Sequence, residues 1–220
     1  MKSYLPLTLL ALALTLLASP CTTIAADLEW AGQTWKSYSG EKDLPLDVTP
    51  SKCGTLTFST KPKGYLYTTK KYKNFVMKFQ WKRDKANPGP AGVLIRTTGE
   101  NKIWPKCLEM QLNKDSAGDF VSLQGFAYNV PKEVDKKRIT EIDHPDFGKV
   151  KICNKAKDVE KKLGEWNDYE IVAKDDVVTI RVNGELINTA TDCETEPGVI
   201  CLTSEGAPIS FKNLSIEETK

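Results

Sequence analysis

Apolar and polar side chains alternate at every second position through residues 74–83, NFVMKFQWKR. Phe75, Met77, Phe79 and Trp81 fall on one face of this segment, and its lysines and glutamine point the other way. A period of two is the period of a β-strand, in which successive side chains point to opposite faces. The segment therefore predicts a strand with one buried face.

Similar short runs recur along the rest of the chain, whereas helical periodicity is nearly absent. Residues 157–163 are the best helical candidate, but they are too few and too charged for more than a turn or two. The Asn183-Gly184 pair predicts a tight hairpin, because both residues tolerate a positive φ. The further strands cover residues 54–60, 64–69, 92–97, 107–113, 120–124, 169–174, 177–182, 185–190, 198–204 and 208–216.

About ten short strands without helices between them predict an all-β fold of two antiparallel sheets packed face to face, a β-sandwich of the jelly-roll kind. Residues 129–154 interrupt the pattern with Pro131, Pro145, Gly148 and many charges. We interpret them as a long loop, and long loops often carry function.

The N-terminus has the layout of a secretory signal. Lys2 precedes the apolar residues 5–18, and small residues follow up to Ala25 and Ala26. We expect a signal peptide over residues 1–25 and a single β-sandwich domain over residues 26–220 of a secreted or periplasmic protein. Lipid anchoring at Cys21 is the alternative. Pro20 directly before that cysteine argues against it.

Charge gives no reason to expect a nucleic-acid or membrane partner. The chain has 31 basic and 29 acidic residues and a formal net charge of +2. No second apolar run is long enough to span a membrane.

Five cysteines follow the signal segment, and the chain contains a single histidine. With no Cys-x-x-Cys spacing, a zinc site or a Cys/His catalytic pair is not expected. Export permits disulfides, and we predict one between Cys153 and Cys193, which bracket the hairpin unit of residues 166–190.

The most informative strand is residues 107–113, CLEMQLN. Its two leucines and its methionine share one face, which must be the core. Glu109, Gln111 and Asn113 share the opposite face, about 7 Å apart. Trp104 precedes the strand and adds an aromatic surface. Aromatic rings beside amide and carboxylate groups suit sugars, so the row predicts a carbohydrate site. The alternative is an ordinary solvated strand face.

Three other residues extend this candidate site. Arg96 shares strand parity with Leu94, and we expect it on the same concave face as Glu109, where it would hold that carboxylate ionised. Glu205 is a possible second carboxylate, and His144 a possible sugar contact. The alternative is that Arg96 is a solvated strand end, Glu205 a turn residue and His144 an exposed loop residue.

Eight segments occur in the order typical of one family: YLYTTKKYKNFVMKFQWKR, AGVLIR, IWPKCLEMQL, GDF, GEWNDYEI, VNGELIN, PGVICLTSEG and ISFKNLSI. Across residues 56–216 the chain thereby resembles the 3-keto-disaccharide hydrolase domain family. That family is a branch of the concanavalin A-like lectin/glucanase superfamily. The resemblance implies the same β-sandwich.

Several candidate residues coincide with the family's motifs. Arg96 matches the arginine that ends one strand, Glu109 and Gln111 match an E-x-Q strand, and Glu205 matches a late Ser-Glu-Gly turn. Lys212 is a departure, because the family commonly has arginine there, and lysine cannot make the same bidentate contact.

The resemblance implies an exported hydrolase for glycosides or disaccharides already oxidised at C3 of the sugar. The ketone acidifies the proton at C2, so a carboxylate can remove it before the C1 substituent leaves. We expect Glu109 as base or acid, Arg96 as donor to the enolate and Gln111 as the orienting amide. Sugar contacts would come from Trp104, Asn113, Glu205 and His144. No cofactor is expected beyond a possible structural calcium.

Two other function classes remain open at this level. A non-catalytic, lectin-like carbohydrate-binding module would lack a second carboxylate near Glu109. A scaffold domain would present a flat face without a pocket around Glu109 and Arg96. An ordinary glucanase fits less well, because its E-x-D-x-x-E strand would need an acid where this chain has Gln111.

Overall fold

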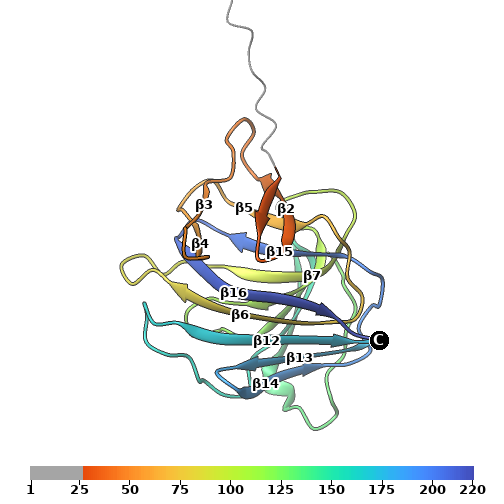
Figure 1. Ribbon diagram of the computed structural model, residues 1–220. Coiled ribbons are helices and arrows are strands. Elements are labelled where there is room, and N and C mark those ends of the chain that lie inside the picture. Colours follow the sequence, from red (N-terminus) through yellow and green to blue (C-terminus); the bar gives the residue numbers. More distant parts are fainter. Residues whose placement is uncertain (1–26) are drawn as a thin grey trace, which may run out of the picture.

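The computed structural model describes residues 27–220 and consists of two stacked antiparallel sheets. Figure 1 shows β12, β13, β14, β6 and β16 running side by side across the front. The fold class predicted from the alternation is confirmed. The predicted signal peptide and the lipidation alternative at Cys21 lie outside the described residues. Within those residues, no helix is long and apolar enough to cross a membrane.

The two sheets contain nine and seven strands. The nine-stranded sheet has the order β1 (Leu28–Trp30), β2 (Gln33–Ser39), β5 (Gly64–Thr68), β15 (Val199–Ser204), β7 (Gly92–Thr98), β8 (Lys106–Gln111), β9 (Phe120–Leu123), β11 (Gly148–Cys153), β10 (Ile139–His144). The seven-stranded sheet has the order β14 (Glu185–Ala190), β13 (Val177–Val182), β12 (Asn167–Lys174), β6 (Phe75–Arg83), β16 (Ile209–Glu218), β4 (Leu56–Phe58), β3 (Val48–Pro50).

The main core lies between the two sheets and is built by the predicted alternation. On β6, every second residue from Phe75 to Trp81 is buried, and the residues between them face outward. On β8, Leu108 and Met110 enter the same core cluster, with Leu112 just after the strand. On both β6 and β8, the face that was predicted to be buried is the face that packs into the core.

The Asn183-Gly184 turn joins β13 to β14 with φ angles of +51° and +84°. Positive φ at both central residues matches the right-handed twist of the flanking strands and is the reason this pair makes tight hairpins. The predicted hairpin is confirmed with both of its strands.

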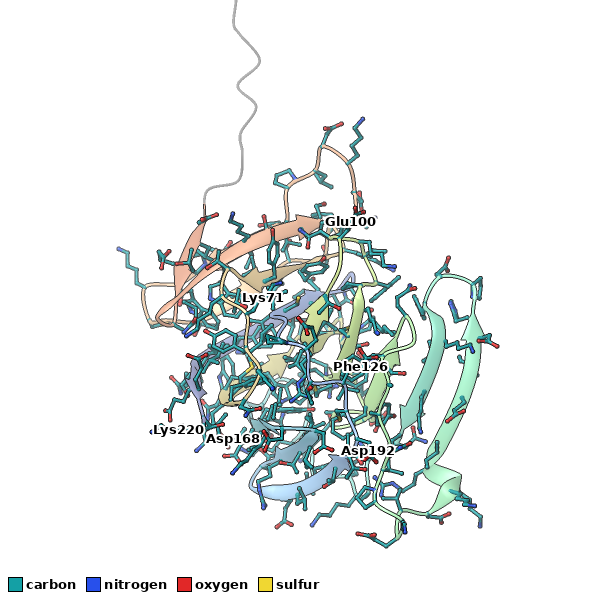
Figure 2. All side chains as sticks on the ribbon, turned by 90° about the vertical axis from the view of Figure 1, so that its right-hand side faces the viewer. Lys71, Glu100, Phe126, Asp168, Asp192 and Lys220 are labelled. Carbon is teal, nitrogen blue, oxygen red and sulfur yellow. The ribbon has the colours of Figure 1, made fainter. Side chains whose placement is uncertain are left out.

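Residues 129–154 are not the long loop that we predicted. They contain the short 3₁₀ helix η1 (Lys136–Arg138) and an antiparallel hairpin of β10 and β11. Figure 2 shows this hairpin, in green at the right, standing out from the body of the sandwich. One face of this hairpin is largely exposed and carries charged side chains. In the sequence, these charges made the strand-like alternation hard to recognise.

The predicted disulfide is wrong, because all five cysteines of the described chain are unpaired. Cys153 is buried at the end of β11, where its Sγ lies 3.5 Å from Asn188 Oδ1. The amide of Asn188 also donates to the carbonyl oxygen of Cys153 at 2.9 Å. Asn188, and no disulfide, therefore links the end of β11 to β14.

One buried ion pair ties β6 to the segment before β12. The guanidinium of Arg83 pairs with Glu160, and the two side chains are only 3% and 8% exposed. Arg83 Nη1 also donates to the carbonyl oxygen of Leu112 at 2.8 Å, and Glu160 Oε1 accepts from the backbone N–H of Ala117 at 3.0 Å. Both charges therefore have further hydrogen-bond partners.

We expect Glu160→Gln to lower the free energy of unfolding by about 3–5 kcal/mol, because it leaves the buried guanidinium without its counter-charge. Urea unfolding measures this loss. Glu185→Gln is the control, since Glu185 pairs with Lys157 at the surface, where such pairs contribute little. Equal losses in the two variants would contradict the assignment.

Candidate functional site

A cavity of about 230 Å³ opens on the outer face of the nine-stranded sheet, the face turned away from the seven-stranded sheet. Glu109 and Gln111 enter it from β8, and Glu205 follows the end of β15. Trp104 and His144 also line it. Five of the seven residues predicted for the site therefore meet in one cavity.

The register of the sheet explains why Glu109 is desolvated. Its cross-strand neighbours are Leu94 on β7 and Val121 on β9, which point to the same outer face. Leu94 belongs to a second apolar cluster that covers this face together with Cys107 and Leu123. Only 3% of Glu109 is exposed. A carboxyl group in such surroundings loses most of its hydration.

The two carboxyl groups of the cavity have raised pKa values for related reasons. Burial raises the pKa of Glu109 well above its ordinary value, and the charge of nearby Glu205 raises it further. Burial also raises the pKa of Glu205, to about 7, while a hydrogen bond from Thr203 and the charge of Lys63 oppose this rise. Both shifts favour the protonated carboxyl group, and Glu205 titrates near neutral pH.

Thr203 and Gly92 fix the positions of these carboxyl groups. The backbone N–H of Gly92 donates to Thr203 Oγ1 at 2.6 Å, and the Thr203 hydroxyl lies 3.4 Å from Glu205 Oε1. A Cβ at residue 92 would lie 2.3 Å from Glu109 Oε1. Only glycine leaves room for the Glu109 carboxyl group in its observed position.

Two buried oxygens in the cavity have no hydrogen-bond partner, Glu109 Oε1 and Gln111 Oε1. Buried polar atoms are rarely left unpaired, because each costs free energy comparable to a lost hydrogen bond. A protonated carboxyl and an amide can each both donate and accept. This pair is therefore ready to bind the hydroxyl or carbonyl groups of a ligand.

Aromatic rings form part of the cavity wall. The rings of Trp104 and Phe147 meet edge to face with centroids 4.9 Å apart, and His144 stacks on Phe147 at 4.0 Å. His144 Nδ1 lies 3.1 Å from the backbone nitrogen of Asp146, which donates to it. In the neutral imidazole this leaves the proton on Nε2.

Arg96 does not meet Glu109, so the predicted ion pair is wrong. Its backbone has a φ of +50°, at an irregularity where the pairing of β7 with β8 shifts register. The guanidinium instead donates to the carbonyl oxygens of Glu194 at 2.6 Å, Asp175 at 2.5 Å and Lys73 at 3.3 Å. Arg96 holds loops together at the end of the sandwich.

Asn113 also lies outside the cavity. It follows the end of β8, and its Oδ1 accepts from the backbone N–H of Ala91 at 2.8 Å. The predicted row along β8 is thus two residues long. Conversely, sequence reasoning missed Phe147, Thr203 and Gly92. The Ser-Glu-Gly turn after Thr203 was the available signal for the β15 side of the site.

No group of three or more Asp, Glu, His or Cys side chains suited to a metal ion occurs in residues 27–220. The structural calcium considered from the sequence stays a prediction.

Residues 28–217 match the family model described as a 3-keto-alpha-glucoside-1,2-lyase-like domain. None of the curated proteins matches this chain.

Solved structures with a similar fold include enzymes and a binding module. A proposed glycosyl hydrolase from Parabacteroides distasonis has a TM-score of 0.58 at 20% identity, over 84% of this chain and 88% of that one. Carbohydrate-binding module CBM66 from Bacillus subtilis has a TM-score of 0.58 at 12% identity, over 84% and 95%. The β-glucanase of Bacillus licheniformis has a TM-score of 0.53 at 15% identity, over 84% and 92%. At these identities the likeness concerns the fold.

The raised pKa values of Glu109 and Glu205 give folding stability a definite pH dependence. The folded protein holds protons that the unfolded chain has already released, so we expect stability to fall as pH rises from about 4.5 towards about 7. In Glu205→Gln this decline should be smaller. Melting temperatures measured across this range test it, with Glu170→Gln on the other sheet as control. Parallel curves for Glu205→Gln and the parent protein would contradict the assignment.

Proposed function

This chain belongs to the family of 3-keto-alpha-glucoside-1,2-lyase-like domains, and we propose that it cleaves 3-keto-glycosides by elimination across C1 and C2. The observation that supports this proposal most directly is the meeting of Glu109 with Glu205 in one cavity, where burial raises the pKa of both carboxyl groups. Acid–base chemistry needs one protonated and one ionised group at the same pH.

The reaction needs a base at C2 and an acid at the leaving group. A base takes the C2 proton, and the electron pair of that bond forms an enolate with the C3 ketone. The bond from C1 to the leaving oxygen then breaks while a proton reaches that oxygen, which leaves a double bond between C1 and C2. Addition of water to this double bond, with oxygen at C1 and a proton at C2, completes a net hydrolysis.

We assign the base to Glu205 and the acid to Glu109. The pKa of Glu205, about 7, makes its carboxylate available near neutral pH, where a base of that pKa is most effective. The deeper burial of Glu109 and its lack of a cationic partner favour its protonated form, which suits an acid. This reverses the expectation that an ion pair with Arg96 would make Glu109 the base.

Gln111 completes the polar side of the site in this proposal. Its amide lies on the same face of β8 as Glu109 and has an unpartnered oxygen in the cavity. An amide offers both donors and acceptors, so it can orient the oxidised ring by hydrogen bonds to ring oxygens.

The second carboxylate also bears on the alternative of a lectin-like module. A binding site for a neutral sugar needs hydrogen-bond donors and acceptors, which amide groups supply without the cost of two buried carboxyl groups. Burying them lowers stability near neutral pH. Their presence in one cavity therefore favours a catalytic role over binding alone.

The test is incubation of the purified protein with matched 3-keto-glycosides and unmodified glycosides, with released aglycone as the readout. We expect turnover of the oxidised substrates only. Glu109→Gln and Glu205→Gln should each lower kcat by about 10²–10⁴-fold, as loss of a proton-transfer group does. Glu170→Gln serves as the control, because Glu170 lies on β12 of the other sheet.

Other outcomes point to other functions. Equal cleavage of unmodified glycosides would indicate ordinary glycoside hydrolysis by a carboxyl pair. Binding of the sugars without any turnover would support the lectin-like module.

A further inference from the structure

We propose that the cavity selects glycosides with an uncharged, apolar aglycone, such as an aromatic ring, in preference to a second sugar. This substrate class rests on the proposed function, because it assumes that the oxidised ring lies at the carboxyl pair. Polar and apolar groups are distributed unevenly across this cavity.

The polar and apolar groups of the cavity come from different strands. Glu205 follows β15, and Glu109 and Gln111 lie on β8. The sheet continues from β8 through β9 and β11 to β10. These three strands contribute five aliphatic side chains to the cavity, Val121, Leu123, Val150, Ile152 and Ile142, and one polar side chain, His144 at the end of β10. The site therefore has a polar half and an apolar half.

A second sugar would fit the apolar half poorly. Sugars carry hydroxyl groups around the whole ring, whereas the five aliphatic side chains cannot donate or accept hydrogen bonds and His144 can satisfy only one hydroxyl. A hydroxyl buried without a partner costs about 1–3 kcal/mol. An apolar group gains free energy at the same position, because it is removed from water together with Val121 and Ile152.

The aromatic wall adds to this preference. Trp104 meets Phe147 edge to face, and a flat ring placed against them can adopt the offset or edge-to-face arrangements that aromatic groups prefer. The carboxyl groups of the cavity, Glu109 and Glu205, both lie on the polar half. The apolar half therefore offers no counter-charge to an ionised aglycone.

Ile142 allows the apolar half to be tested without disturbing the core. It lines the cavity from the edge strand β10 and is 44% exposed. Leu186 is equally exposed, 44%, on β14, an edge strand of the other sheet. Replacing either residue with serine changes a similar side chain at a similar degree of exposure.

The experiment compares kcat/KM for benzyl, methyl and glucosyl 3-keto-glucosides. Benzyl and methyl alkoxides are similar leaving groups, so their difference reports aglycone binding. We expect the benzyl substrate to exceed both others by about 10-fold or more, the factor that corresponds to about 1.4 kcal/mol. Ile142→Ser should reduce the benzyl-to-methyl ratio several-fold, whereas Leu186→Ser should preserve it.

Each result decides the proposal. Equal kcat/KM values for all three substrates, or a preference for the disaccharide, would overturn the proposed selectivity for apolar aglycones while leaving the proposed reaction intact. If no 3-keto-glycoside is cleaved, the proposed function fails, and binding is then compared through tryptophan fluorescence. If benzyl glucoside binds more tightly than methyl glucoside and Ile142→Ser reduces this difference, the apolar binding site is supported although the proposed reaction is not. Equal binding would overturn it.

Discussion

The nine-stranded sheet must be packed on both of its faces, and the site depends on this constraint. Its inner face meets the main core, while its outer face carries a second apolar cluster that includes Tyr65, Leu94 and Cys107. A carboxyl group on such a face has little access to water. Burial on this face is therefore the main cause of the raised pKa of Glu109, and the charge of Glu205 adds to it.

Much of the fold could be predicted because a strand with one buried face has apolar residues at every second position of its sequence. The same rule placed Glu109 and Gln111 opposite the core, as observed. The rule failed at Arg96, because the positive φ of this residue redirects its side chain. No residue pattern in the sequence predicts that positive φ. It failed also in residues 129–154, where charges on an exposed hairpin hid the strands.

The contacts between distant segments were beyond the sequence for a different reason. The meeting of Glu109 with Glu205 depends on which strands are neighbours, and β15 lies beside β7 although about 100 residues separate them. A strand pattern indicates which way a side chain faces but not which strand lies next to it. The family resemblance supplied the candidate Glu205, and the sheet order brings it to the cavity.

The two carboxyl groups stand on backbone of very different character. Glu109 lies within a central strand, whereas Glu205 lies on a turn followed by Gly206 at a φ of +107°. Mutation can reshape a turn while the sheet stays intact, but it cannot easily shift a central strand. Mutations in the turn can therefore remove or reorient the carboxylate of Glu205 with little effect on the sheet. Such a step offers a short path between a sugar-cleaving and a sugar-binding protein on the same sandwich.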